Sequence, residues 1–198
     1  MPRSADTLNT KSALGRNATP IPVIDAARYV LGGHITLDPA SDQVINQAVG
    51  AERIYTVDQD GYSQPWQADT LWLNPPGKSY TLKNGRKTHV TAAKWFRKLY
   101  RHWNAGDVRH AIALCYRGGS VGSLGVKMLE LPLCITAAGA PHPQVNGSGR
   151  LNFELIDGDR RLPQQSNTQS SILILLSRDP RLIERFQERF SAFGVVRV

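Results

Sequence analysis

Short apolar runs of strand length alternate along this chain with stretches whose apolar residues recur at helical spacing. This alternation predicts an α/β sandwich built on a largely parallel sheet, because each strand can be joined to the next by a helix that packs on the sheet. The expected helices cover residues 20–31, 41–49, 90–103, 124–129 and 180–190. The expected strands cover residues 35–38, 53–57, 70–73, 111–116, 133–137, 151–155, 172–176 and 195–198.

The composition is that of an ordinary globular domain. Of the 198 residues, 41% are hydrophobic and 20% are charged, a balance that excludes wholesale disorder. The longest apolar run, residues 172–176, is far shorter than the ~18 residues of a membrane span. The polar first residues lack the apolar core of a signal peptide. We therefore expect a flexible tail over residues 1–18, one compact domain over residues 19–198, a cytoplasmic location and no membrane contact.

The sulfur and imidazole side chains indicate neither a disulfide framework nor a metal site. Cys115 and Cys134 lie within apolar runs, so we interpret them as small buried side chains in a reducing compartment. The five histidines are scattered and do not have the spacing of zinc ligands. We expect no metal.

Positive charge is concentrated in one segment. Lysine and arginine number 24 against 16 acids, which gives a net charge of +8. Residues 78–110 alone carry nine of these cations and one acid, Asp107, with five aromatic side chains among them. Such clustering predicts a nucleic-acid-binding face, whereas the alternative is a solvated helix face followed by a mobile loop.

The sequence Leu71-Trp72-Leu73-Asn74-Pro75-Pro76 carries an apolar strand directly into Asn-Pro-Pro. The simplest interpretation is a strand that ends in a rigid turn. A chemical interpretation is available because the two prolines fix the backbone and leave no N–H groups. The Asn74 side-chain oxygen and the Pro75 carbonyl can then act as paired acceptors for the two N–H donors of an exocyclic amine. Both bonds together bend the planar nitrogen and expose its lone pair as a nucleophile.

Asn-Pro-Pro at the end of a strand resembles the signature of S-adenosylmethionine-dependent amino-methyltransferases. Thr19-Pro20, the run Leu37-Asp38-Pro39-Ala40-Ser41, residues 55–61, Trp66 and residues 72–77 follow one another as in the phage-type Dam family. Lys94-Trp95 and residues 149–153 are also similar to that family, so the resemblance extends over roughly residues 19–176 in order. These enzymes, encoded by bacteriophages and prophages, methylate N6 of adenine in DNA.

The resemblance implies a Rossmann-like methyltransferase fold, S-adenosylmethionine as cofactor and double-stranded DNA as partner, with no obligate protein partner. The catalytic residues it implies are Asn74, Pro75 and Pro76. The cofactor residues it implies are Thr19, Pro20, Asp38, Pro39, Ala40, Ser41, Asp58 and Asp60. Asp38 would bind the ammonium or the ribose of the cofactor, and the helix that opens at Ser41 would bind its carboxylate. Asp58 or Asp60 would accept a hydrogen bond from the amine of the cofactor's adenine. Because the amine of a paired adenine is inaccessible, the base must flip out of the duplex.

Three departures from the family pattern matter. The residues after Asp38 lack the Gly-x-Gly of most cofactor loops. Only about 35 residues separate Asp38 from Asn74, so the second strand can be short or absent. Gly77 occupies a position where many adenine methyltransferases stack an aromatic residue on the target base. Tyr80 is our candidate replacement, since Trp72 fits a core position. The expected phosphate clamp is formed by Lys78, Lys83, Arg86 and Lys87.

Two alternatives remain open from the sequence. The same tripeptide serves methylation of a cytosine amine or of a glutamine side-chain amide. The missing glycines and Gly77 also suit a catalytically inactive nucleic-acid-binding module.

Overall fold

The computed structural model of the chain describes residues 18–76, 81–82, 85, 87–116, 130–157, 160–163 and 170–198. Within these residues the helices are α1 (Ile21–Val30), α2 (Gln43–Val49), the 3-10 turn η1 (Val57–Gln59), α3 (Ala92–Ala105) and α6 (Pro180–Phe190). The strands are β1 (Ile35–Asp38), β2 (Ala51–Ile54), β3 (Ala68–Leu73), β4 (Val108–Tyr116), β5 (Leu133–Thr136), β6 (Glu154–Asp157), β7 (Arg160–Pro163), β8 (Ser171–Leu176) and β9 (Gly194–Arg197).

Seven of the described strands form one sheet in the order β2-β1-β3-β4-β8-β5-β9. The pairs β1–β2, β1–β3 and β3–β4 are parallel, whereas β8 is antiparallel to both β4 and β5, and β9 is antiparallel to β5. Five strands therefore run in one direction and two in the other. The prediction of a mixed α/β domain with a largely parallel sheet is confirmed.

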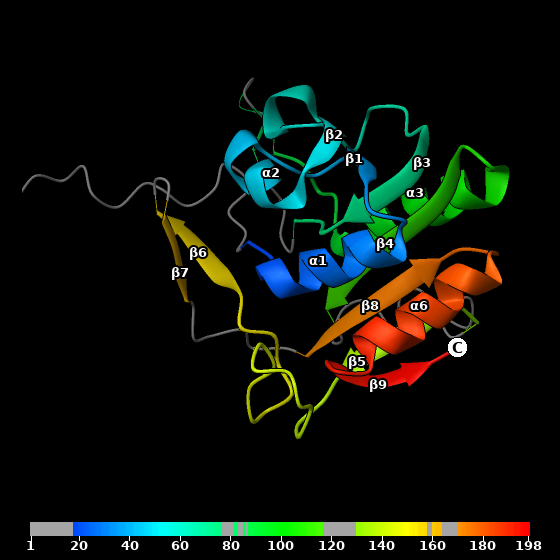
Figure 1. The fold of residues 1–198 in the computed structure, drawn as a ribbon. Coiled ribbons are helices and arrows are strands. Elements are labelled where there is room, and N and C mark those ends of the chain that lie inside the picture. Colours follow the sequence, from blue (N-terminus) through cyan, green and yellow to red (C-terminus); the bar gives the residue numbers. More distant parts are fainter. Residues whose placement is uncertain are drawn as a thin grey trace, which may run out of the picture.

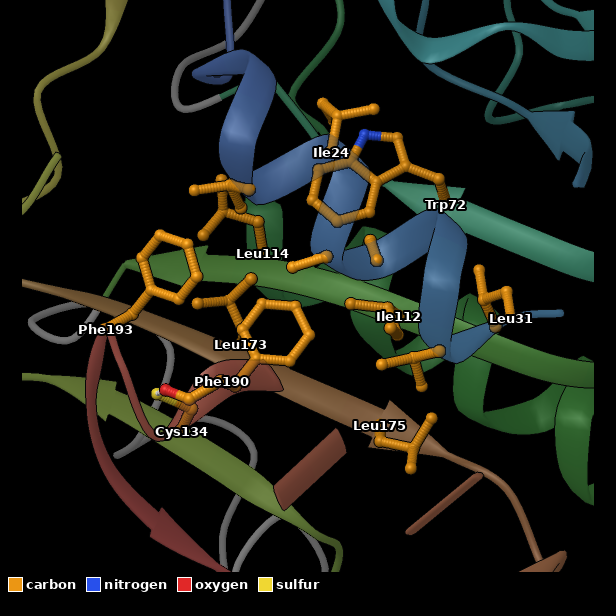
Figure 2. Close-up of a cluster of buried hydrophobic side chains, with 14 of the residues drawn as sticks. Ile24, Leu31, Trp72, Ile112, Leu114, Cys134, Leu173, Leu175, Phe190 and Phe193 are labelled. Carbon is orange, nitrogen blue, oxygen red and sulfur yellow. Dashed lines mark hydrogen bonds between the residues drawn. The ribbon is translucent and has the colours of Figure 1, made fainter. Parts of the chain in front are cut away.

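Helices cover both faces of this sheet (Figure 1). On one face, α1, α2 and α6 pack over side chains of β3, β4 and β8, and Figure 2 shows Trp72 beside Ile24 in this cluster. On the other face, α3 packs over the alternate residues of the same strands, with Trp95, Phe96 and Leu99 at the centre. The alternation arises because successive residues of a strand point to opposite faces. Trp72 is 1% exposed, which confirms its interpretation as a core residue.

Most expected elements are present, and the differences have local causes. The second strand does form, but as the four-residue edge strand β2 two residues earlier than expected. The expected strand at 151–155 is shifted to β6, and β7 pairs with it in a stretch where we expected no strand. This two-stranded hairpin lies outside the main sheet (Figure 1), so its residues carry little of the apolar pattern that reveals a core strand. The helix expected at 124–129 and residues 1–17 lie outside the described residues.

Both cysteines are buried, as expected, at 1% and 0% exposure. Burial raises the pKa of the Cys115 thiol and of the Cys134 thiol to about 12. In the described ranges, no helix is both long and apolar enough to cross a bilayer.

Candidate functional site

The chain changes direction across the sheet between β1 and β3. From β1 it passes first to β2 on one side, and then returns to place β3 on the other side of β1. In open α/β sheets, the crevice at the carboxyl ends of two such strands is where ligands bind. Asp38 ends β1 and Asn74 follows β3, so both predicted polar residues lie at this point. Leu37 pairs with Leu71, which places Asn74 two residues beyond the level of Asp38.

Asp38 organises the turn that leaves β1. Its side chain is fully buried, and its Oδ1 accepts a hydrogen bond from the backbone N–H of Ala40 at 3.0 Å. The turn is also tied to the segment after β2, because the Tyr55 N–H donates to the Asp38 carbonyl and the Ser41 N–H donates to the Tyr55 carbonyl. A carboxylate held by a backbone N–H in this way remains oriented without solvent. The residues from Asp38 to Ser41 are all buried.

Thr19 and Asn74 meet directly, although 55 positions separate them in the sequence. The Asn74 Nδ2 donates to the Thr19 Oγ1 at 3.0 Å, and the two residues are 3% and 4% exposed. This bond fixes the rotation of the Asn74 amide, because one end of the planar group is tied to the protein. The amide oxygen then points away from Thr19. Pro20, Pro75 and Pro76 are also buried here.

The hairpin of β6 and β7 holds Thr19 in place. Ala18 and Glu154 form an antiparallel bridge, with N···O distances of 2.8 and 3.0 Å, so Ala18 at the end of the expected tail is part of the fold. Arg161 pairs with Glu154 at 2.9 Å and donates to the Thr19 carbonyl at 3.4 Å. No local pattern reveals these anchors, because Arg161 lies 142 positions from Thr19.

The two remaining acids of the predicted cofactor set lie on and after the turn η1. Asp58 is exposed, whereas Asp60 is partly buried and has a positive φ of 49°. Gly61 packs this turn onto the first one, because a Cβ placed on it would lie 2.0 Å from the Pro39 carbonyl oxygen. The Gly61 carbonyl in turn accepts from the indole N–H of Trp66 at 2.8 Å. The segment with Asp58 and Asp60 is thereby fixed next to the turn with Asp38.

One detail of the expected carboxylate site is wrong. Asp42, not Ser41, is the N-cap of α2, and its carboxylate already accepts from the Ile45 N–H at 2.8 Å. The Ser41 N–H is likewise occupied by Tyr55. A second carboxylate at this helix end would meet the negative charge of Asp42. The hydroxyl of Ser41 is different, since its Oγ is buried and has no hydrogen-bond partner among the described residues.

The structure describes only one residue of the expected phosphate clamp. Lys87 is exposed and bridges Thr81 in a short antiparallel contact between Asn74 and α3. Tyr80, Lys78, Lys83 and Arg86 lie outside the described residues, as does Gly77.

A count of charges along the sequence groups Lys98 with the other cations of the basic segment, but the structure buries its side chain. It is 8% exposed, and its Nζ donates to the carbonyls of Tyr62 and Gln64 while lying 4.7 Å from the centre of the Trp66 ring. It therefore fastens the segment after η1 to α3. Together with Tyr62, Arg101, His102, Ala105 and Asp107, it lines a depression of about 390 Å³, which includes none of the predicted catalytic or cofactor residues that the structure describes. Burial, with a contribution from Arg101, lowers the pKa of Lys98 to about 8, although Asp60 partly opposes the shift.

We expect the stability of the wild type relative to Lys98→Met to increase as the pH rises from about 8 to about 10.5. In that interval the unfolded chain keeps the Lys98 proton while the folded chain has lost it, so the free energy of unfolding increases with pH. Denaturant titrations of both proteins at several pH values measure this difference. Lys94→Met, on the exposed side of the same helix, is the matched control. If the difference in the free energy of unfolding between the wild type and Lys98→Met does not change with pH, the lowered pKa of Lys98 is contradicted.

The fold and these residues define a class: a three-layer α/β protein whose buried Asp and Asn side chains lie at the switch point of the sheet. Across the described part of the chain, no group of three or more His, Cys, Asp or Glu side chains is arranged to hold a metal ion. Comparisons with protein-family models, curated protein sequences and solved structures found no match to this chain.

Proposed function

We propose that this protein transfers a methyl group from S-adenosylmethionine to the exocyclic amine of adenine in double-stranded DNA. The observation that carries the proposal is the placement of Asn74-Pro75-Pro76 beside Asp38 at the switch point, with the Asn74 amide oriented by Thr19. A Rossmann-like methyltransferase fold is the finer form of the same proposal. It is supported by the parallel half of the sheet and by helices on both faces.

The residues around Asp38 fit the polar parts of the cofactor. The buried carboxylate of Asp38 suits an ammonium or a pair of ribose hydroxyls, because an ionised acceptor forms strong, charge-assisted hydrogen bonds with either group. The buried Ser41 Oγ, without a partner in the described residues, offers one more hydrogen-bonding group to the same ligand. Asp58 or Asp60 is assigned as the acceptor for the amine of the cofactor's own adenine, not of the target base. The α2 N-terminus is not part of this site, because Asp42 occupies it.

When bound, S-adenosylmethionine supplies a methyl group on a positively charged sulfur, which is already a good leaving group. The Asn74 Oδ1 and the Pro75 carbonyl oxygen each accept a hydrogen bond from one N–H group of the flipped adenine's amine. The nitrogen lone pair of the amine held in this way would face the methyl group that the cofactor would supply, and transfer of that methyl group would leave the electrons of its S–C bond on sulfur. The surplus proton of the nitrogen then passes to water. The burial of Asn74 strengthens its hydrogen bond to the amine, since water competes little there.

Thr19→Val should slow methyl transfer about 10-fold or more, with little change in the affinity for S-adenosylmethionine. Valine keeps the shape of threonine but leaves the Asn74 Nδ2 without its acceptor, and an unsatisfied buried donor costs about 1–3 kcal/mol. Thr19→Ser retains the hydroxyl and should restore most of the rate. Single-turnover rates and calorimetric dissociation constants separate this role from direct cofactor binding. If Thr19 instead contacts the cofactor, the valine variant will lose affinity rather than rate.

The proposed function is tested by incubating the purified protein with methyl-labelled S-adenosylmethionine and double-stranded DNA of mixed sequence. The DNA is then hydrolysed and its nucleosides are separated. We expect the label in N6-methyldeoxyadenosine. Label in a methylated cytosine, or on the glutamine side chains of added protein, would overturn the proposal in favour of another amino-group substrate. Absence of both labelling and cofactor binding would indicate an inactive nucleic-acid-binding module.

A further inference from the structure

The exposed side of α3 carries a row of cations with no acid among them. Lys94, Arg97 and Arg101 are exposed, and the helix sequence from Ala92 to Ala105 contains no aspartate or glutamate. At 3.6 residues per turn, the three side chains fall within an arc of about 60° and span about 10 Å along the helix axis. We name these three residues the α3 ridge. Lys98 is not part of it, because its side chain is buried.

The α3 ridge begins at the edge of the sheet that carries Asn74. The helix connects the carboxyl end of β3 to the amino end of the parallel strand β4, so its first turn lies at the carboxyl edge and its last turn at the opposite edge. Lys87 is exposed and adds a further positive charge to the segment of chain that leads from Asn74 into α3. The cations therefore form a track that leads away from the candidate site.

The other long surface helix shows that this charge distribution is not a general feature of the protein. Helix α6 also carries three arginines at regular spacing, but Glu184 and Glu188 alternate with them. Two of these arginines also lie over the Tyr29 ring, at 5.7 Å for Arg185 and 3.9 Å for Arg189. The helix lies on the opposite face of the sheet from α3. A run of cations with no acid between them is thus a feature of helix α3 and not of helix α6.

We infer that the α3 ridge is the surface that holds the sugar-phosphate backbone of duplex DNA while Asn74 addresses a flipped base. Successive phosphates of one strand follow its winding path, and long lysine and arginine side chains can extend toward them, so a row of about 10 Å can engage about two to three phosphates of one strand. The contacts are with the backbone, and they position the duplex without reading its sequence. The inference rests on the proposed function for the choice of DNA as partner.

The test compares two triple variants with the same loss of charge. Lys94→Gln/Arg97→Gln/Arg101→Gln removes the ridge, and Arg181→Gln/Arg185→Gln/Arg189→Gln is the matched control on α6. Binding to a fluorescent duplex is followed by anisotropy without cofactor, at salt concentrations between about 50 and 200 mM. Thermal melting checks that each variant is folded. Because this measurement needs no methyl transfer, the inference can fail or succeed separately from the proposed reaction.

We expect the ridge variant to lower the magnitude of the slope of log affinity against log salt by about 2–3, since each lost phosphate contact contributes about 0.9. Its affinity should fall at least ~10-fold, equally for unrelated duplex sequences. The control variant should keep the wild-type slope. Equal losses in the two variants would mean that net charge alone acts, and an unchanged slope in the ridge variant would mean that DNA binds elsewhere; either result overturns the inference.

Discussion

Asn74→Ala should lower the rate of methyl transfer at least ~100-fold while the affinity for S-adenosylmethionine stays nearly unchanged. The substitution removes the amide oxygen that we propose accepts from the target amine, and loss of one preorganised polar contact with the reacting group typically costs ~100–1,000-fold in rate. Asn74 is 3% exposed, so water cannot readily take the place of the missing oxygen. Single-turnover kinetics with saturating DNA measure the rate, and calorimetry measures the dissociation constant of the cofactor.

The matched control for this prediction is Asn104→Ala. Asn104 is exposed near the end of α3, where its side chain accepts from Arg178 at 3.4 Å, so its loss should not change the rate. Both variants must melt cooperatively for the comparison to hold. If Asn74→Ala turns over at a rate close to that of the wild type, the proposed mechanism, in which Asn74 and the Pro75 carbonyl accept from the target amine, is wrong.

Gly61→Ala should destabilise the protein by about 2–3 kcal/mol and weaken the binding of S-adenosylmethionine as well. The added methyl group would lie 2.0 Å from the Pro39 carbonyl oxygen and 2.8 Å from the Tyr55 Cβ, so the backbone itself must move. Overpacking of a buried site typically costs about 1–3 kcal/mol, and here the clash is with backbone that cannot rotate away. The movement separates the turn carrying Asp60 from the turn carrying Asp38, which are the two proposed sides of the cofactor site.

Gly147→Ala serves as the comparison for the glycine substitution. Nothing lies within 4 Å of a Cβ at that position, so the same added methyl group meets open space. We expect a change in the free energy of unfolding of less than about 0.5 kcal/mol there, as for most surface substitutions. Chemical denaturation of the two variants measures the difference. Equal stability of Gly61→Ala and Gly147→Ala would show that the two turns are not packed together as described.

The pattern of apolar residues predicted most core elements because burial acts on each segment separately. Helix α6 begins and ends at the residues expected from its apolar stripe, and β8 matches its apolar run to within one residue. Where the pattern was weak, prediction was poorer. The hairpin strand β7 contains two arginines and lies outside the main sheet, so no burial signal marks it.

The charge count illustrates a second limit. Lys98 and Arg101 are equivalent in a tally of the basic segment, but one is buried against two carbonyl groups and the other is exposed. The two side chains lie on different faces of α3. The face that carries Lys98 is covered by Tyr62 and Trp66, which come from a segment more than thirty residues away.

By itself, the sequence determined the α/β layers and the positions of Asp38 and Asn74 at the ends of two strands, because periodicity acts over a few neighbouring residues. Only the tertiary structure decided which of these residues meet. The contact between Thr19 and Asn74 depends on the pairing of β1 with β3 and on the anchoring of Ala18 by Glu154, both of which are long-range backbone pairings. The packing of Gly61 on Pro39 and the burial of Lys98 have the same origin. Contacts between distant segments are fixed by the packing of the whole core, and no short stretch of sequence contains that information.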